Sequence, residues 1–235
     1  MNQTLPAFWA VIPAAGVGAR MAADRPKQYL QLGGKTILEH SLDCFLDHPN
    51  VKGVVVSVAA DDPYWPGLRC ASDPRIQRAA GGQERADSVL NALLLLHAQG
   101  GADSDWVLVH DAARPNLARS DLDRLLFELA DDPVGGLLAV PARDTLKRAN
   151  ADGRVSKTID RSTVWQAYTP QMFRLGALHR ALADSLVADV AITDESSAIE
   201  WAGQSPRLIE GRSDNIKVTR PEDLEWLRQR WSQRR

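Results

Sequence analysis

Short apolar runs that alternate with helix-type segments are the feature that most limits how this chain can fold. Four such runs occupy residues 8–12, 51–58, 106–110 and 136–140. A nearly continuous apolar run suits a strand that is covered on both faces, as in a sheet of mostly parallel strands. The alternation therefore predicts an α/β fold, wound as in nucleotide-binding sheets.

The segments between these runs carry helix-start signals. Residues 36–39 and 219–222 both have the spacing of a capping box. Ser120 precedes a stretch whose leucines fall on one helical face, and residues 89–96 indicate a further apolar helix. Residues 34–36 look like the end of a Walker A loop, but the required earlier glycine is missing, so they indicate a turn that leads into a helix.

Residues 145–159 interrupt the alternation. Two runs of alternating polar and apolar residues flank Asp152-Gly153, a pair that is typical of a hairpin turn. Because an isolated two-stranded hairpin is only marginally stable in water, we expect it to pack on a second copy of the chain. The sequence therefore predicts one domain over residues 1–235, with a protruding β-hairpin arm at approximately 142–161 that forms a homodimer.

Composition narrows the partners and the location. The formal net charge is only −2, with both signs spread along the chain, so neither nucleic acid nor a membrane is expected as a partner. No apolar run approaches the roughly 20 residues that span a bilayer, and no signal peptide is apparent. Cys44 and Cys70 lack the spacing of a metal site or a disulfide framework. We therefore expect a cytoplasmic protein.

The strongest candidate for chemistry follows the first predicted strand. The small residues at 13–19 let the backbone approach a ligand, and successive amides beside a helix start bind anions. Arg20 and Lys27 add two positive charges. This combination predicts a triphosphate site, although a tight turn with two surface cations is the simpler alternative. Met21 stands where a dinucleotide fingerprint requires Gly or Ala, which argues against a dehydrogenase.

Two further segments could complete such a site. The glycines before Ser88 could fold over a flat base, although a helix cap at Asp87 or Ser88 is the simpler interpretation. Asp111 and Arg114 follow the third predicted strand at its carboxyl end, where ligands bind in open sheets; a structural ion pair is the alternative. The histidines lack the spacing of metal ligands or of a catalytic triad.

Taken together, these segments resemble the 2-C-methyl-D-erythritol 4-phosphate cytidylyltransferases of the non-mevalonate isoprenoid pathway over essentially the whole chain. The motifs that carry the resemblance are residues 13–21, 26–29, 82–88, 110–115, 144–147 and 165–171. The resemblance implies a Rossmann-like nucleotidyltransferase domain. It further implies transfer of CMP from CTP to 2-C-methyl-D-erythritol 4-phosphate, which gives 4-diphosphocytidyl-2-C-methyl-D-erythritol and pyrophosphate.

The resemblance also implies a role for each site residue. Catalysis would depend on Arg20, Lys27 and Lys217. The nucleotide would be bound by Pro13, Ala14, Ala15, Gly16, Gly18, Gly82, Gln83 and Ser88. The acceptor would be bound by Asp111, Arg114, Thr145, Arg161, Thr169 and Thr193, of which Thr145 and Arg161 would come from the arm of the partner subunit. Mg²⁺ would bind mainly through the CTP phosphates, and no side chain is assigned as its ligand.

The base selectivity of the protein and two alternative functions are undecided by the sequence. Gln83 stands where family members can carry Asp beside the base, which puts base selectivity in question. The chain could also be a cytidylyltransferase for another polyol phosphate, such as ribitol 5-phosphate. A second alternative is that the chain is not an enzyme but a nucleotide-binding module. Such a module would bind CTP without releasing pyrophosphate.

Overall fold

The computed structural model describes residues 4–16 and 24–233. In these ranges the strands are β1 (Phe8–Pro13), β2 (Gln31–Leu32), β3 (Lys35–Thr36), β4 (Val51–Val58), β5 (Ile76–Ala80), β6 (Trp106–Val109), β7 (Gly135–Pro141), β8 (Leu146–Ala149), β9 (Val155–Ile159), β10 (Trp165–Arg174) and β11 (Arg207–Glu210). The helices are α1 (Ile37–Leu46), α2 (Arg85–Ala98), α3 (Arg119–Leu129), α4 (Leu175–Val187), α5 (Glu195–Trp201) and α6 (Pro221–Ser232), and η2 (Lys27–Tyr29) is a short 3₁₀ turn. Among these described helices, none has the length and apolar character needed to cross a membrane.

One seven-stranded sheet forms the centre of the molecule, in the order β11-β7-β10-β6-β1-β4-β5. Strands β4 and β6 pair in parallel with β1, and β5 pairs in parallel with β4. Strand β10 runs antiparallel to both β6 and β7, whereas β11 is parallel to β7. The predicted α/β fold with a mostly parallel sheet is confirmed, and β10 is the exception that the sequence did not indicate.

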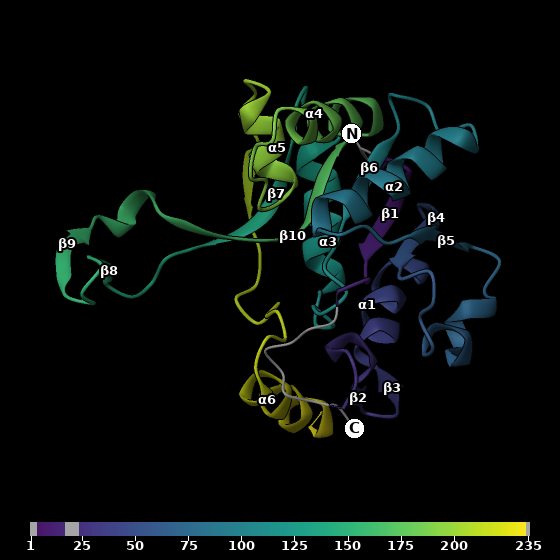
Figure 1. Ribbon diagram of the computed structural model, residues 1–235, viewed down its shortest axis with the longest axis horizontal. Helices are drawn as coiled ribbons and strands as arrows, with labels where there is room; N and C mark the ends of the chain where they lie inside the picture. Colours follow the sequence, from purple (N-terminus) through teal and green to yellow (C-terminus); the bar gives the residue numbers. More distant parts are fainter. Residues whose placement is uncertain (1–3, 17–23, 234–235) are drawn as a thin grey trace.

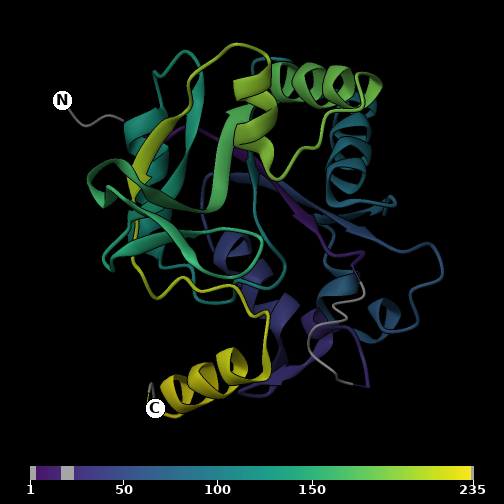
Figure 2. The same ribbon diagram turned by 60° about the vertical axis from the view of Figure 1, so that its left-hand side comes forward.

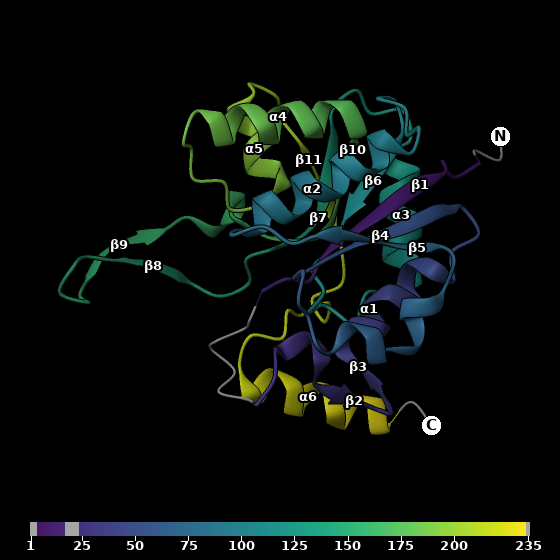
Figure 3. The same cartoon turned by 45° about the vertical axis from the view of Figure 1, so that its right-hand side comes forward.

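Helices cover both faces of this sheet, with α2, α4 and α5 on one side and α1 and α3 on the other (Figure 3). Side chains of β1 alternate between the two resulting cores. Ile12 packs in the core that includes α1 and α3, whereas Val11 packs in the core that includes α2 and α4. Burial on both faces explains why β1 has a continuous apolar sequence instead of an alternating one.

The sheet order reverses at β1, because β4 pairs on one side of it and β6 on the other. In open α/β sheets, ligands bind at such a reversal, outside the carboxyl ends of the strands. The segments that follow β1, β5 and β6 leave the sheet at this edge. The topology therefore brings together three segments that the sequence analysis singled out.

Helix α6 lies apart from the central sheet, at the opposite end of the molecule from α4 (Figure 2). Its Leu224 and Leu227 pack with Leu32 and with the start of α1 in a small separate core. Val218 belongs to the same core, and its amide donates a hydrogen bond to the carbonyl of Ala113 at 2.8 Å. This packing fixes the segment before α6 against the loop that follows β6.

The helix caps agree with the sequence at α1 and differ at α6. At α1, Thr36 and Glu39 form the predicted capping box, in which the Glu39 carboxylate accepts from the Thr36 amide at 2.8 Å. At α6 the N-cap is Arg220, and Asp223 accepts from its amide at 2.8 Å. The capping box predicted at residues 219–222 is therefore wrong by one position. Glu222 and Asp223 both carry a carboxylate, and it is Asp223 that caps the helix.

The predicted hairpin is confirmed as β8 and β9, which pair antiparallel and project from the body between β7 and β10 (Figure 1). Gly153 in the turn has a φ of 75°, a conformation that glycine adopts without strain. The side chains of this arm are largely exposed, and Val155 is 63% exposed. Packing of the arm on a second subunit stays a prediction.

Gly81 allows the segment after β5 to lie against the loop after β1. A Cβ atom on Gly81 would stand 2.3 Å from the Cβ of Ala15 and 3.3 Å from the backbone of Val58. Any side chain at this position must therefore displace Ala15 or the end of β4.

We expect Gly81→Ala to lower the free energy of unfolding by about 1–3 kcal/mol through overpacking. Gly67→Ala is the control, because a Cβ at Gly67 meets nothing within 4 Å. Urea denaturation of both variants measures the difference. Equal stability of the two variants would contradict the close approach.

Candidate active site

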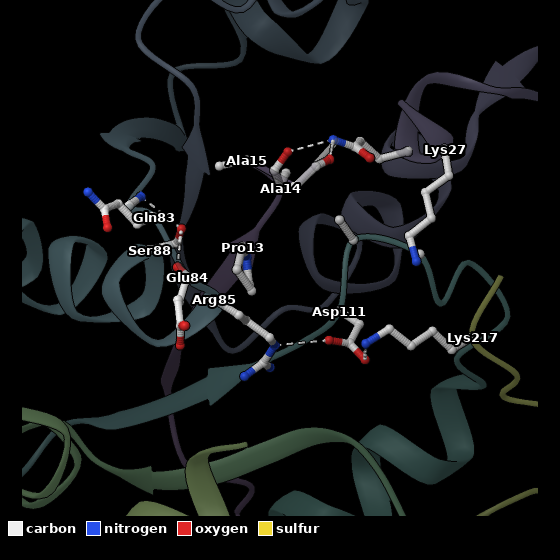
Figure 4. Close-up of a pocket in the computed structure, with 15 residues that line it drawn as sticks. Pro13, Ala14, Ala15, Lys27, Gln83, Glu84, Arg85, Ser88, Asp111 and Lys217 are labelled. Atoms are coloured by element: carbon white, nitrogen blue, oxygen red, sulfur yellow. Dashed lines mark hydrogen bonds and ion pairs between the residues drawn. The ribbon is translucent and has the colours of Figure 1, made fainter. Parts of the chain in front are cut away.

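A cavity of about 330 Å³ lies at the edge of the sheet where the strand order reverses. Its walls come from the loop after β1, from η2, from the start of α2, from the loop after β6 and from Lys217 (Figure 4). The predicted site residues that line it are Pro13, Ala14, Ala15, Gly16, Lys27, Gly82, Gln83, Ser88, Asp111 and Lys217. Arg20 and Gly18, which were also predicted, lie outside the described residues.

The cavity has two chemically different ends. Figure 4 shows the amines of Lys27 and Lys217 on one side of Pro13, and Gln83 and Ser88 on the other. The Lys27 amine is positioned by a hydrogen bond of 2.9 Å to the carbonyl of Val218. One end can therefore attract phosphates, while the other offers an amide, a hydroxyl and backbone groups to a neutral polar ligand.

The loop after β1 is tied to η2 by one side chain. The Gln28 amide donates to the carbonyl of Ala14 at 2.7 Å and to that of Gly16 at 2.9 Å. Gln28 also lines the cavity and is 4% exposed. Gln28 belongs to the motif at residues 26–29, and no role was predicted for it.

Helix α2 begins at Arg85, four residues before the apolar run that predicted it. Glu84 is the N-cap, and Asp87 caps the helix from the third helical position, because its carboxylate accepts from the Glu84 amide at 2.9 Å. The predicted cap at Asp87 is therefore confirmed, whereas Ser88 is not the cap. The Ser88 hydroxyl instead accepts from the amide of Gly82 at 3.0 Å. The earlier start puts the positive end of the helix dipole, and Arg85 itself, at the wall of the cavity.

Asp111 is the electrostatic centre of the site. Its Oδ1 lies 3.2 Å from Arg85 Nε, and its Oδ2 lies 3.2 Å from Arg114 Nε and 3.1 Å from Lys217 Nζ. Burial alone would raise the pKa of this carboxyl group, but the nearby charges of Arg85, Lys217 and Arg114 outweigh it and hold the pKa well below its usual value. Asp111 is therefore an anion that gathers three cations.

Arg85 is held from its other side by Glu195, the first residue of α5. The guanidinium and the carboxylate form a bidentate pair at 2.6 and 3.0 Å, and the Glu195 side chain is 1% exposed. Burial would lower the pKa of Arg85, but Glu195 and Asp111 together raise it. Neither member of this pair was predicted. The predicted helix began at residue 89 and so did not include Arg85, and no sequence pattern links Arg85 to Glu195.

Arg114 and Thr169 contact Asp111 but do not line the cavity. Arg114 also donates to the carbonyl of Asn215 at 2.7 Å, and its guanidinium lies 4.5 Å from the ring centre of Tyr168. The Thr169 hydroxyl accepts from the Asp111 amide at 3.1 Å. These contacts fix the position of the carboxylate, as the alternative of a structural ion pair anticipated for Arg114.

His110 is fully buried next to these residues. Its Nε2 lies 3.0 Å from the Arg114 carbonyl and its Nδ1 lies 3.0 Å from the Thr169 hydroxyl. Burial lowers the pKa of His110 to about 4, so the ring is neutral near pH 7. It is a buried packing residue directly after β6.

Three predicted acceptor residues lie away from the cavity of this single chain. Thr145 and Arg161 lie in the arm, on either side of the β8–β9 hairpin, and Arg161 contacts the carbonyl of Arg143. Thr193 precedes α5, and its amide donates to the Ser197 hydroxyl at 3.1 Å. Their roles stay predictions.

In the part of the chain that the structure describes, no three side chains of His, Cys, Asp or Glu converge as a metal site. Both oxygens of Asp111 already pair with cations. The cavity residues therefore suit a divalent ion that is already bound to a polyphosphate. Mg²⁺ commonly takes phosphate and water oxygens as most of its ligands.

Comparisons with known proteins find relatives that match the whole chain. The family model for 2-C-methyl-D-erythritol 4-phosphate cytidylyltransferase matches residues 8–228. Proteins of that name from Pseudomonas putida strain W619 and Pseudomonas entomophila strain L48 are each 87% identical to this chain over 235 residues, which is 100% of both chains compared.

Solved structures with the same fold carry related names. A crystal structure of 4-diphosphocytidyl-2C-methyl-D-erythritol synthase has a TM-score of 0.83 and 42% identity, covering 95% of this chain and 98% of that chain. The 2-C-methyl-D-erythritol 4-phosphate cytidylyltransferase of Francisella tularensis has a TM-score of 0.80 and 37% identity, covering 94% of this chain and 97% of its own. The chain belongs to the 2-C-methyl-D-erythritol 4-phosphate cytidylyltransferase family.

Proposed function

We propose that this protein transfers the cytidylyl group of CTP to the phosphate of 2-C-methyl-D-erythritol 4-phosphate, releasing pyrophosphate, in isoprenoid precursor biosynthesis. The observation that carries the proposal is the cavity in which Lys27, Lys217 and the small-residue loop after β1 meet. The names of relatives that match the whole chain support the same reaction.

The chemistry follows from the charges of the reactants. The acceptor phosphate is already an anion, so its oxygen attacks the α-phosphorus of CTP without a general base. A new oxygen–phosphorus bond forms there, and the bond to the bridging oxygen of the departing pyrophosphate breaks. The protein must supply positioning and positive charge, because two polyanions are brought together. A buried, neutral His110 takes no part in this scheme.

The two ends of the cavity suit the two ends of CTP. Lys27, together with Arg20, would stabilise the charge on the phosphates. Gly82, Gln83 and Ser88 would bind the cytosine base, where the Gln83 amide can both donate and accept hydrogen bonds. Lys217 would bind the acceptor phosphate beside Asp111, whose carboxylate it already contacts.

We propose that Mg²⁺ binds with the triphosphate, with no side chain assigned as its ligand. It supplies neutralising charge on the phosphate oxygens when bound. The residues of this chain would orient the resulting complex through the loop amides and Lys27.

We further propose that the active site is completed across a homodimer, in which Thr145 and Arg161 of the partner subunit reach the acceptor. The exposed arm and its position between β7 and β10 support this arrangement. Residues 1–235 would act as one domain, since β1 from the beginning of the chain and β11 from near its end belong to the same seven-stranded sheet. A cytoplasmic location stays our expectation.

We expect Lys27→Ala to lower kcat by about 10²–10³, because it removes positive charge where the transition state gains negative charge. The control is Lys52→Ala, since Lys52 pairs with Asp105 away from the cavity. Steady-state pyrophosphate release measures both variants. A near-wild-type kcat for Lys27→Ala, with its melting temperature unchanged, would refute the assignment.

An acceptor screen tests the reaction itself. Purified protein with Mg²⁺ is given CTP, UTP, ATP or GTP, together with either 2-C-methyl-D-erythritol 4-phosphate or ribitol 5-phosphate. We expect the fastest pyrophosphate release from CTP with the methylerythritol acceptor. Faster release with ribitol 5-phosphate would support the related polyol enzyme, and CTP binding without any release would support a non-catalytic module.

Complementation tests the shared site. Lys27→Ala and Arg161→Ala should each be nearly inactive. When the two variants are co-expressed, they form mixed dimers in which one of the two sites combines an intact Lys27 with an intact Arg161 from the other subunit. We expect co-expression to recover about a quarter of the wild-type rate, the share expected from random pairing in a C2 dimer.

A chain that lacks residues 146–158 should sediment as a monomer. Monomeric full-length protein, or no recovery, would contradict the arm proposal.

A further inference from the structure

We infer that Gln28 is a positioning residue that holds residues 14–16, directly after β1, in the conformation that receives the nucleotide phosphates. The inference rests on the proposed function, since it takes the cavity ligand to be CTP. It concerns a side chain to which the reaction scheme assigns no step. Gln28 acts through the backbone of Ala14, Ala15 and Gly16 and need not touch the reacting atoms.

Both hydrogens of one amide group are used on the same loop. Gln28 Nε2 donates to the carbonyls of Ala14 and Gly16, at 2.7 and 2.9 Å. A primary amide has two such hydrogens, so this pair of bonds uses its full donor capacity. The residue is 4% exposed, and a buried amide that lost these partners would carry an unsatisfied polar group. Ala14, whose carbonyl accepts the shorter of the two bonds, is labelled among the residues that line the cavity in Figure 4.

The two bonds set the direction of the peptide groups in the loop. In a planar trans peptide the carbonyl of Ala14 and the amide of Ala15 point in opposite directions. Because the Ala14 carbonyl faces Gln28, the Ala15 amide faces away from Gln28. The carbonyl oxygens, which would repel a phosphate, are thereby occupied, and a donor of an anion-binding turn is presented instead. The Ala14 amide is already used by the sheet, since it donates to the Ser57 carbonyl at 2.8 Å.

The same turn also carries the cation of the phosphate end. Gln28 follows Lys27 directly in η2, and the next residue, Tyr29, anchors the turn by donating its hydroxyl hydrogen to Asp62 at 2.7 Å. Tyr29 is 2% exposed. Gln28 and Tyr29 therefore fix the backbone of the turn that carries Lys27 relative to residues 14–16. A change at Gln28 should weaken CTP binding without directly altering the acceptor subsite near Asp111.

Gln28→Glu tests this role because it keeps the shape and removes the two donors. An ionised carboxylate would face two carbonyl oxygens and push the loop away. Burial beside these oxygens should raise the pKa of the introduced carboxyl above that of an exposed glutamate. The protonated form, which has one O–H donor, should therefore gain population as the pH falls from 8 to 6. The defect should be largest at pH 8 and should shrink toward pH 6.

Three measurements carry the test: Kd for CTP with Mg²⁺ by calorimetry, steady-state kinetics for each substrate, and thermal unfolding. We expect Gln28→Glu to raise Kd and KM for CTP at least about tenfold at pH 8, while KM for the acceptor changes less than about twofold. Gln31→Glu is the matched control, because it adds the same charge three residues away at an exposed position. Gln28→Leu removes the donors without a charge and should show a defect that does not depend on pH; it serves if Gln28→Glu fails to fold.

The outcomes separate this inference from the reaction. Folded Gln28→Glu that binds CTP within about twofold of Gln31→Glu at pH 8 would overturn the inference, as would equal losses for both substrates. A defect in Gln28→Leu confined to the melting temperature would also overturn it. If the wild-type protein binds CTP but transfers nothing, the proposed reaction fails, and the calorimetric comparison still decides the role of Gln28.

Discussion

The buried carboxylate of Asp111 is the interaction on which the arrangement of the site depends. It draws together Arg85 from the start of α2, Arg114 from its own loop and Lys217 from the segment before α6. Burying a single charge is costly unless partners compensate it, and three cations do so here. Two of these cations, Arg85 and Lys217, line the cavity together with Lys27, so positive charge faces the cavity around the single carboxylate of Asp111. One anion thus organises a surface that attracts other anions.

The neighbouring backbone serves the same end through close packing. The loop after β1 meets the segment after β5 at Gly81, and Gln28 ties it to the turn that carries Lys27. The positive charge of Lys27 and the backbone of residues 14–16 therefore both line the cavity. Such preorganisation means that little has to be rearranged when a phosphate binds, which is how electrostatic stabilisation becomes effective in an enclosed site.

Sequence patterns predicted what depends on local order or on burial of whole segments. The apolar runs predicted β1, β4, β6 and β7, and Asp152-Gly153 predicted the hairpin. Patterns failed where long-range pairing decides the outcome. Strand β10 contains a proline and polar residues, and it is stabilised by pairing on both sides with β6 and β7. The pair Arg85–Glu195 joins residues that are 110 positions apart, and no spacing rule indicates it.

The docking of Val218 on Ala113 has a consequence for how the enzyme is made. The sheet strands β1, β4, β5 and β6 all precede residue 110, yet Lys217 comes near the end of the chain. During synthesis, a nascent chain could assemble much of its parallel sheet while one wall of its catalytic pocket was still inside the ribosome. Contacts of such long sequence separation are slow to form, and these must wait until residues 217 and 218 have been synthesised. Competence for catalysis is thus acquired as a last event, after the scaffold is already in place.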